Sequence, residues 1–177
     1  MSEELDDLAR QLRQGAGREL REEAAADEEL TELLRRRKLT LADATRSAMH
    51  RGDRVTIVVA GMSMSHPVMA VGTDYLTLDE GDRVIDVPLA AAVVVVSARS
   101  AGGTSGRPAA TTFRARLAEH EQEGGSVEVV TTEERISGRM DVVATDHLVI
   151  QDPSGDRFYV PLGIVMAVFS RFRPRLN

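Results

Sequence analysis

Short apolar segments separated by turn signals dominate the chain from residue 39 onward. Such segments predict two groups of strands, over residues 55–60, 68–72, 75–79, 83–88 and 92–97, and over residues 127–131, 138–143, 147–151, 157–161 and 165–170. Clusters of glycine, aspartate and proline separate many of these strands. The pattern therefore predicts a mainly β protein, in which residues 62–67 form a loop between the first two strands.

A short helix is expected before the first group of strands. Thr40 is a suitable N-cap, and Asp43, three residues later, completes a sequence like a capping box. Leu41, Ala44 and Ala48 follow at helical spacing. We therefore expect these three side chains to share the buried face of this helix.

A second short helix is expected before the second group of strands. Thr111 or Thr112 is its N-cap, and Phe113 and Leu117 are its apolar side chains. The glycines that begin at Gly124 end it.

The two groups of elements repeat one another. A shift of 72 residues aligns Gly52, Val55, Val58, Val71, Thr73, Asp74 and Leu76 with Gly124, Val127, Val130, Val143, Thr145, Asp146 and Leu148. With one more residue, the Val-Pro-Leu segment at residues 87–89 falls on residues 160–162, and Ser97 falls on Ser170. These ordered identities predict two copies of one structural unit. One helix and five short strands per copy are typical of a small, strongly bent barrel.

Charge and composition divide the chain further. Residues 1–34 carry eleven acidic residues against four arginines, with leucines at helical spacing, and four basic residues follow them. We therefore expect an acidic helical arm with a basic end over residues 1–38, and the first barrel over residues 39–97. A flexible linker rich in glycine, serine and alanine is expected over residues 98–110. The second barrel follows over residues 111–171, and a basic tail over residues 172–177.

Two motifs of each copy resemble the Sm-like (LSm/Hfq) superfamily. They are Gly-x-x-Val-x-x-Val at the start of the first strand and Val-x-Thr-Asp-x-Leu across the turn after the second. The hydrophobic-Pro-Leu segment before the last strand also recurs in bacterial members of that superfamily. The resemblance covers about residues 40–97 and 112–170, and it implies two tandem five-stranded Sm-like barrels. PRC-type barrels are the alternative for the fold.

The resemblance implies RNA binding and ring formation, but the RNA pocket of the superfamily is not matched. Asp74 and Asp146 match its turn aspartate. Leu76 and Leu148 stand where a side chain should stack on a base, and Val-Pro-Leu segments stand where a basic pair is expected. We therefore expect no base-stacking pocket here.

The last strand of each copy is apolar at successive positions, over residues 90–96 and 163–169. Both faces of such a strand are expected to be covered. The two copies could pair with each other, chains could associate, or the helices could cover the second face. Sm-like proteins pair fourth and fifth strands between neighbours. We expect self-association through the last strands, since a ring of three chains would hold six barrels and close by symmetry.

The composition of the chain excludes several classes of function. The net charge of −6 and the small aromatic set, four phenylalanines and two tyrosines, argue against a general nucleic-acid binder. The absence of cysteine excludes disulfides and thiolate chemistry. No apolar run approaches the roughly 20 residues of a membrane span, and no signal-peptide segment is recognised. These features predict a cytoplasmic protein without a membrane partner. A single lysine and a single asparagine suit a GC-rich bacterial genome.

No catalytic residue, metal site or cofactor is expected. The four histidines, His50, His66, His120 and His147, are far apart and lack ligand spacing. No pair of carboxylates is placed for acid–base catalysis. Asp74 and Asp146 are assigned a structural role, in which their side chains cap their tight turns.

Two clusters of basic side chains are candidates for binding nucleic-acid phosphates: Arg35, Arg36, Arg37 and Lys38, and Arg171, Arg173 and Arg175. Pairing with the acidic arm is the alternative role. Two functions follow. The protein is either an RNA-associated regulator that contacts phosphates through these clusters, or a protein-interaction scaffold or adaptor whose Sm-like barrels no longer bind nucleic acid and whose acidic arm binds a protein partner.

Overall fold

The computed structural model describes residues 25, 27–99, 103, 106 and 110–171. The chain divides into two units, residues 1–39 and residues 40–177. In the first unit, residues 27–38 are helical, as expected for the end of the arm, and Leu30, Leu33 and Leu34 are exposed along this helix.

Two helices of the second unit begin where the sequence predicts, and the second of them also ends at the predicted glycine. Helix α2 (Leu41–Arg51) starts at a complete capping box between Thr40 and Asp43. Helix α3 (Phe113–Glu123) starts at Thr112, whose hydroxyl accepts a hydrogen bond from the Ala115 amide. Both helices end at a glycine in the left-handed conformation, Gly52 and Gly124, which lets the chain turn sharply into the next strand.

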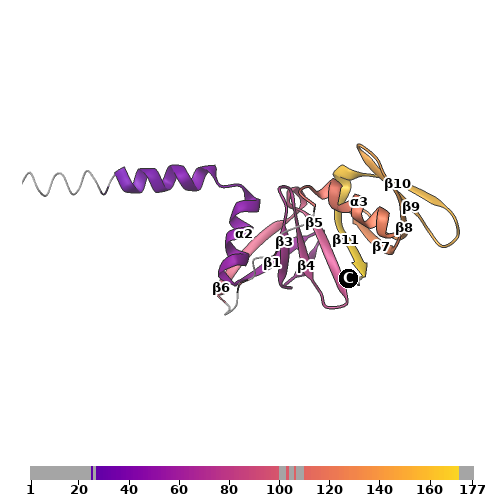
Figure 1. Ribbon diagram of the computed structural model, residues 1–177, viewed down its shortest axis with the longest axis horizontal. Helices are drawn as coiled ribbons and strands as arrows, with labels where there is room; N and C mark the ends of the chain where they lie inside the picture. The colour runs from indigo at the N-terminus through magenta and orange to yellow at the C-terminus, as the bar shows by residue number, and fades with distance from the viewer. Residues whose placement is uncertain (1–24, 26, 100–102, 104–105, 107–109, 172–177) are drawn as a thin grey trace, which may run out of the picture. The chain divides into compact units, whose positions relative to one another are not determined.

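The rest of this unit is built from antiparallel strands (Figure 1). The first copy holds β1 (Asp53–Val59), β2 (Met62–Met64), β3 (Val68–Val71), β4 (Tyr75–Asp79), β5 (Arg83–Pro88) and β6 (Val93–Arg99). The second copy holds β7 (Ser126–Thr131), β8 (Arg135–Val143), β9 (His147–Gln151), β10 (Arg157–Pro161) and β11 (Val165–Arg171). A short 3-10 turn precedes the last strand of each copy, η1 (Leu89–Ala91) and η2 (Leu162–Ile164). The predicted mainly β architecture with helices is confirmed.

The strands form two sheets, in the orders β2-β1-β6 and β10-β9-β8-β7-β11-β5-β4-β3. The second copy is therefore one continuous five-stranded part of the larger sheet, whereas the first copy is divided between both sheets. The described strands form no closed barrel, so the expected pair of barrels is not confirmed in that form.

The division of the first copy arises at residues 62–67, where the prediction of a loop is wrong for residues 62–64 and holds for residues 65–67. Residues Met62–Met64 form β2, which pairs with β1, and β3 pairs with β4. In the second copy, the single strand β8 pairs with both β7 and β9. Pro67 stands in the interruption between β2 and β3, where it has no amide hydrogen to donate to a neighbouring strand.

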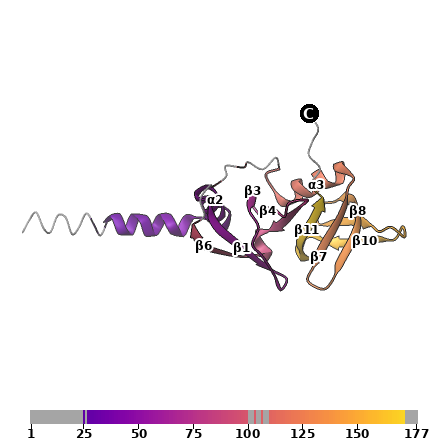
Figure 2. The same ribbon diagram turned by 90° about the horizontal axis from the view of Figure 1, so that it is seen from below.

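The buried face of α2 also differs from the prediction. Its buried side chains are Ala42, Thr45, Ala48 and Met49, whereas Leu41 and Ala44 are exposed. Helix α2 packs mainly on β1 and β3. The equivalent helix α3, which packs mainly on β8 (Figure 2), buries Phe113 at the position of Leu41, because Tyr75 of the first copy covers that ring.

Candidate interaction site

The two copies are joined by strand pairing within the chain. Strand β5 of the first copy and β11 of the second pair antiparallel, with Asp86 opposite Val168 and Ile85 opposite Phe169. These are the fourth strand of one copy and the last strand of the other in the predicted repeat. For β11 the structure therefore shows the alternative in which the two copies pair inside one chain, and the expected self-association between chains stays a prediction.

We call the paired strands β5 and β11 the seam between the two copies. A buried polar cluster lies on one face of this seam. Asp86 is fully buried, and one oxygen of its carboxylate accepts a hydrogen bond from the Thr77 hydroxyl. The other oxygen lies 3.0 Å from Arg116 Nε and 2.7 Å from His120 Nε2. Arg116 also pairs with Glu119 at 2.7 Å. Every member of this cluster except Thr77 and Asp86 comes from α3, so the cluster fixes the helix of the second copy on the strands of the first.

Charge and burial change the acidity of two groups at the seam. Burial alone would lower the pKa of Arg116, but the carboxylates of Asp86 and Glu119 raise it above its usual value. Burial, with a smaller contribution from Asp86, raises the pKa of Tyr75 to about 12. Both groups therefore keep their protons at neutral pH, and each donates a hydrogen bond across the seam.

The first residues of α3 are held by the first copy. The Asp74 carboxylate accepts a hydrogen bond of 2.7 Å from the Phe113 amide, and the Tyr75 hydroxyl donates one of 3.0 Å to the Ala110 carbonyl. The expectation that Asp74 caps its own turn thus gives way to a longer-range role, because its carboxylate caps the next helix. Asp146 hydrogen bonds to His147 at 2.7 Å, which lowers the pKa of this exposed carboxyl.

Removing the Tyr75 hydroxyl is expected to weaken this contact moderately. The change Tyr75→Phe leaves the buried ring in place but leaves the Ala110 carbonyl without this donor, at a cost of about 1–2 kcal/mol in the free energy of unfolding. Urea unfolding followed by circular dichroism measures it. The exposed Tyr159→Phe is the matched control, with an expected change below about 0.5 kcal/mol, and equal changes in both variants would contradict the role of Tyr75.

The last strands of the two copies differ in what covers them. On β11, Ala167 and Phe169 are buried against the core of the first copy. On β6, Val93 is 63% exposed, Val95 45% and Val96 46%. Strand β6 is also an edge strand of its sheet, as is β10 of the larger one. The prediction that both faces of the last strand are covered thus holds for β11 and fails for β6 within one chain.

Strand register identifies which residues of β6 and β11 are equivalent. Val55 and Val127 are aligned in the repeat, and they pair with Val96 and Ser170 respectively. Val96, and not Ser97, therefore holds the position of Ser170, because a register shift between Val165 and Ala167 inserts a residue into β11. By the same count, Val93 and Val95 hold the positions of Ala167 and Phe169. The exposed valines of β6 are thus the equivalents of side chains that the seam buries.

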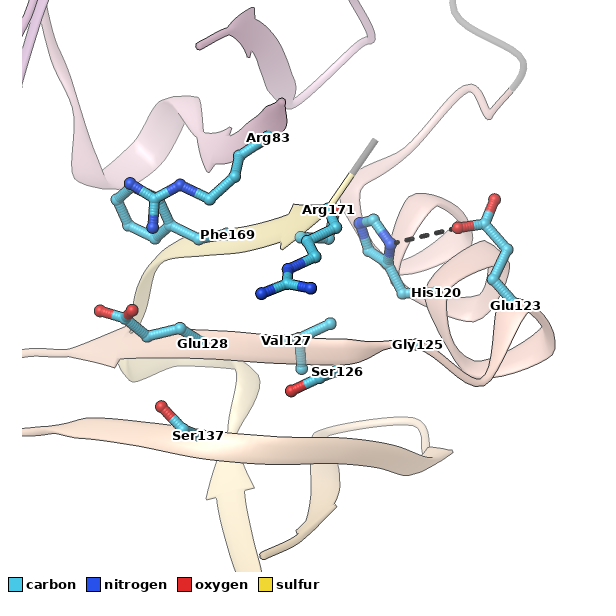
Figure 3. A pocket seen from close by; sticks show the side chains of 11 residues that line it. Arg83, His120, Glu123, Gly125, Ser126, Val127, Glu128, Ser137, Phe169 and Arg171 are labelled. Carbon is cyan, nitrogen blue, oxygen red and sulfur yellow. Dashed lines mark ion pairs between the residues drawn. The ribbon is translucent and has the colours of Figure 1, made fainter. Parts of the chain in front are cut away.

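A cavity of about 390 Å³ opens at one end of the seam (Figure 3). The Arg83 guanidinium lies over the Phe169 ring, 5.4 Å from its centre, and also pairs with Glu80. His120 Nδ1 lies 3.8 Å from Glu123, the ion pair drawn in Figure 3, and Glu128 pairs with Arg135. The acidic groups of the lining are thus matched with basic neighbours, and the cavity carries no charge excess that would select a ligand.

The structure places the predicted phosphate-binding residues in different units. Arg35, Arg36, Arg37 and Lys38 are exposed at the end of the helix over residues 27–38, where Arg35 and Arg36 both pair with Glu32. Arg171 is the last residue of β11; its side chain is exposed and lines the cavity. Arg173 and Arg175 lie outside the described residues, as do residues 1–24 of the arm.

Sequence reasoning missed Asp86, Arg116 and His120. A signal was present in β5, where Asp86 is a single acid among Val84, Ile85 and Val87, but its partners lie 30 and 34 residues further on in a separate helix. In the part of the chain that the structure describes, no group of three or more histidines, aspartates or glutamates is arranged to hold a metal ion.

Comparison with known proteins adds no identity: neither a protein family nor a curated protein matches this sequence. Among the described residues, no helix has the length and apolar character needed to cross a membrane.

Proposed function

We propose that this is a non-catalytic binding and assembly protein, and that the uncovered face and edge of β6 form its binding surface. One observation carries the proposal. The face of β11 that holds Ala167 and Phe169 is buried by a neighbouring copy, whereas Val93 and Val95 in the same positions of β6 are exposed to solvent. An exposed valine-rich edge strand is a template for pairing with another strand.

Protein association is favoured over RNA binding by the charges near the candidate clusters. Arg35 and Arg36 share a carboxylate partner, Glu32, which competes with phosphates for their guanidinium groups. The surface of β6 is apolar, and neither a stacking aromatic nor a basic pair belongs to it. The Sm-like resemblance supports an assembly role, with a cytoplasmic location, and the RNA-associated regulator remains the competing proposal.

A single substitution on β6 tests the proposal. Val95→Glu places a charge on the exposed face, where it is expected to alter stability by less than about 0.5 kcal/mol but to prevent strand addition. Size-exclusion chromatography with light scattering should give the unmodified protein, alone or with a co-purified protein partner, a mass above that of one 19.3 kDa chain, with an absorbance ratio at 260 and 280 nm typical of protein. The variant should return to the mass of one chain, with association weakened at least tenfold.

Ser137→Glu is the matched control, because it adds the same charge at an exposed strand position of the second copy and should leave the mass unchanged. A second control, deletion of residues 1–34, separates a partner bound through the acidic arm from one bound through β6. Bound nucleic acid that is lost at high salt and retained by Val95→Glu would overturn the proposal in favour of the RNA-associated regulator.

A further inference from the structure

We infer that the partner of β6 is the β9–β10 hairpin of a second copy of this chain, docked head to tail on the surface formed by β6 and α2. This inference rests on the proposed function and names its partner. Its basis is the seam inside the chain, which uses the fourth strand of the first copy and the last strand of the second. The equivalent fourth and last strands, β10 and β6, each lie at one end of a sheet, whereas the other ends are formed by β3 and β2, which take no part in the seam.

The repeat defines the expected register of the new pair. In the seam, Val168 is opposite Asp86 and Ser170 is opposite Val84. Val94 and Val96 hold the positions of Val168 and Ser170, as shown above. Tyr159 and Arg157 hold those of Asp86 and Val84, because Leu148 pairs with Val160 as Leu76 pairs with Val87. The inferred contact therefore sets Val94 opposite Tyr159, and Val96 opposite Arg157, of the neighbouring chain.

The helices extend the match beyond the strands. In the seam, α3 presents Arg116 and His120 to the polar row formed by Thr77 and Asp86. The equivalent positions of α2 are Ala44 and Ala48, since both helices are counted from their capping threonines. Ala44 is exposed and available to a second chain, whereas Ala48 is fully buried in the core of its own chain.

The row equivalent to Thr77 and Asp86 is apolar, as these alanines require. It consists of Val142, Val149 and Tyr159, which stand opposite one another across β8, β9 and β10. Val142 is 43% exposed and Tyr159 is 65% exposed. In the inferred contact the large Tyr159 ring thus faces the small Ala44 side chain, where in the seam the smaller Asp86 carboxylate faces Arg116. These two exposed positions are complementary in size and polarity, and neither matches its counterpart in the seam.

The start of the helix supplies a third correspondence. In the seam, the Asp74 carboxylate caps α3 at the Phe113 amide, and the Tyr75 ring lies 6.2 Å from the Phe113 ring. The equivalents are Asp146 and His147 on one chain and Leu41 on the other. The Asp146 side chain is 86% exposed and Leu41 is exposed, so both are accessible for this contact. Since each chain carries one surface of each kind, the contact is heterologous and produces rings or filaments.

Two complementary variants test the direction of assembly. Ala44→Arg blocks the α2–β6 surface with a good helix former, and Tyr159→Asp blocks the β9–β10 surface; both positions are exposed. Each variant alone should have the mass of one chain under light scattering. An equimolar mixture should contain a species of two chains, because one intact surface of each kind remains. A mixture that stays monomeric while the unmodified protein associates would overturn the head-to-tail contact.

Disulfide trapping tests the register in a chain that has no cysteine of its own. Residues directly opposite in antiparallel strands lie close enough for a disulfide. Val96→Cys with Arg157→Cys in one chain should therefore give a ladder of linked chains under mild oxidation. The control, Val95→Cys with Arg157→Cys, places the thiols on opposite faces and should give less than a tenth of that product.

The outcomes separate the inference from the proposed function. Absence of the ladder, or an equal yield from both pairs, would overturn the register. If the unmodified protein is a single chain at about 100 μM but binds another protein in a manner that Val95→Glu abolishes, the inference fails and the proposed function stands. If Val95→Glu changes no association, the proposed function fails as well.

Discussion

Replacing Asp86 by alanine is expected to lower the free energy of unfolding of residues 40–177 by about 3–5 kcal/mol. The carboxylate is fully buried, and it accepts hydrogen bonds from Thr77, Arg116 and His120. Its removal leaves a largely buried guanidinium without its main charge partner at the seam and a buried imidazole without its acceptor. Burying such groups without partners costs far more than the loss of a surface ion pair.

Urea unfolding followed by circular dichroism measures this effect, and Asp82→Asn is the control. Asp82 is an exposed acid in the turn before β5, so its change should stay below about 0.5 kcal/mol. A double-mutant cycle of Asp86→Ala with His120→Ala should show coupling of at least about 1 kcal/mol, because the two side chains are in direct contact. Additive effects would contradict the idea that the cluster acts as a unit.

The sequence predicted local features of this fold well. The bounds of β4, β5, β9 and β10 match the prediction, and so does the capping box at Thr40. These features depend on neighbours within a few residues, such as a turn glycine or a capping hydroxyl, so a single sequence contains the necessary signals.

Features that depend on which surfaces meet could not be predicted in the same way. Leu41 was expected in the core because its spacing suits a buried helix face, but among the described residues no side chain covers it as Tyr75 covers Phe113, and Leu41 is exposed. Its equivalent, Phe113, is buried only because Tyr75 of the other copy lies against it. The apolar character of β6 was recognised from the sequence. That β11, and not β6, pairs with β5 could be learned only from the structure.

The same reasoning explains why the candidate binding site was only partly anticipated. An apolar last strand indicated that something covers it, and association between chains was favoured from the sequence over pairing inside one chain. The structure realises the first for β11 and leaves β6 exposed. The basic clusters were identified from charge alone, and charge alone does not place side chains on a common surface.

Gly138→Ala is expected to lower the free energy of unfolding by about 1–3 kcal/mol, the usual range for inserting an extra carbon into a packed region. A Cβ at this buried position of β8 would overlap the backbone carbonyl of Gln151 and lie 2.7 Å from the Ile150 side chain. The strand could accommodate it only by moving away from β9. The first copy has His66 at the equivalent position, and its strand is interrupted there between β2 and β3.

This comparison predicts where the damage appears, as well as its size. Hydrogen exchange should become faster in the second half of β8, at Val142, which pairs with Val149 of β9, while β7 stays protected. Gly125→Ala is the control, because a Cβ there meets no atom within 4 Å and its φ is not positive. Equal stability of the two variants would show that β8 absorbs the added carbon without separating from β9. The continuity of the second copy would then owe less to Gly138 than to the absence of a proline at the position of Pro67.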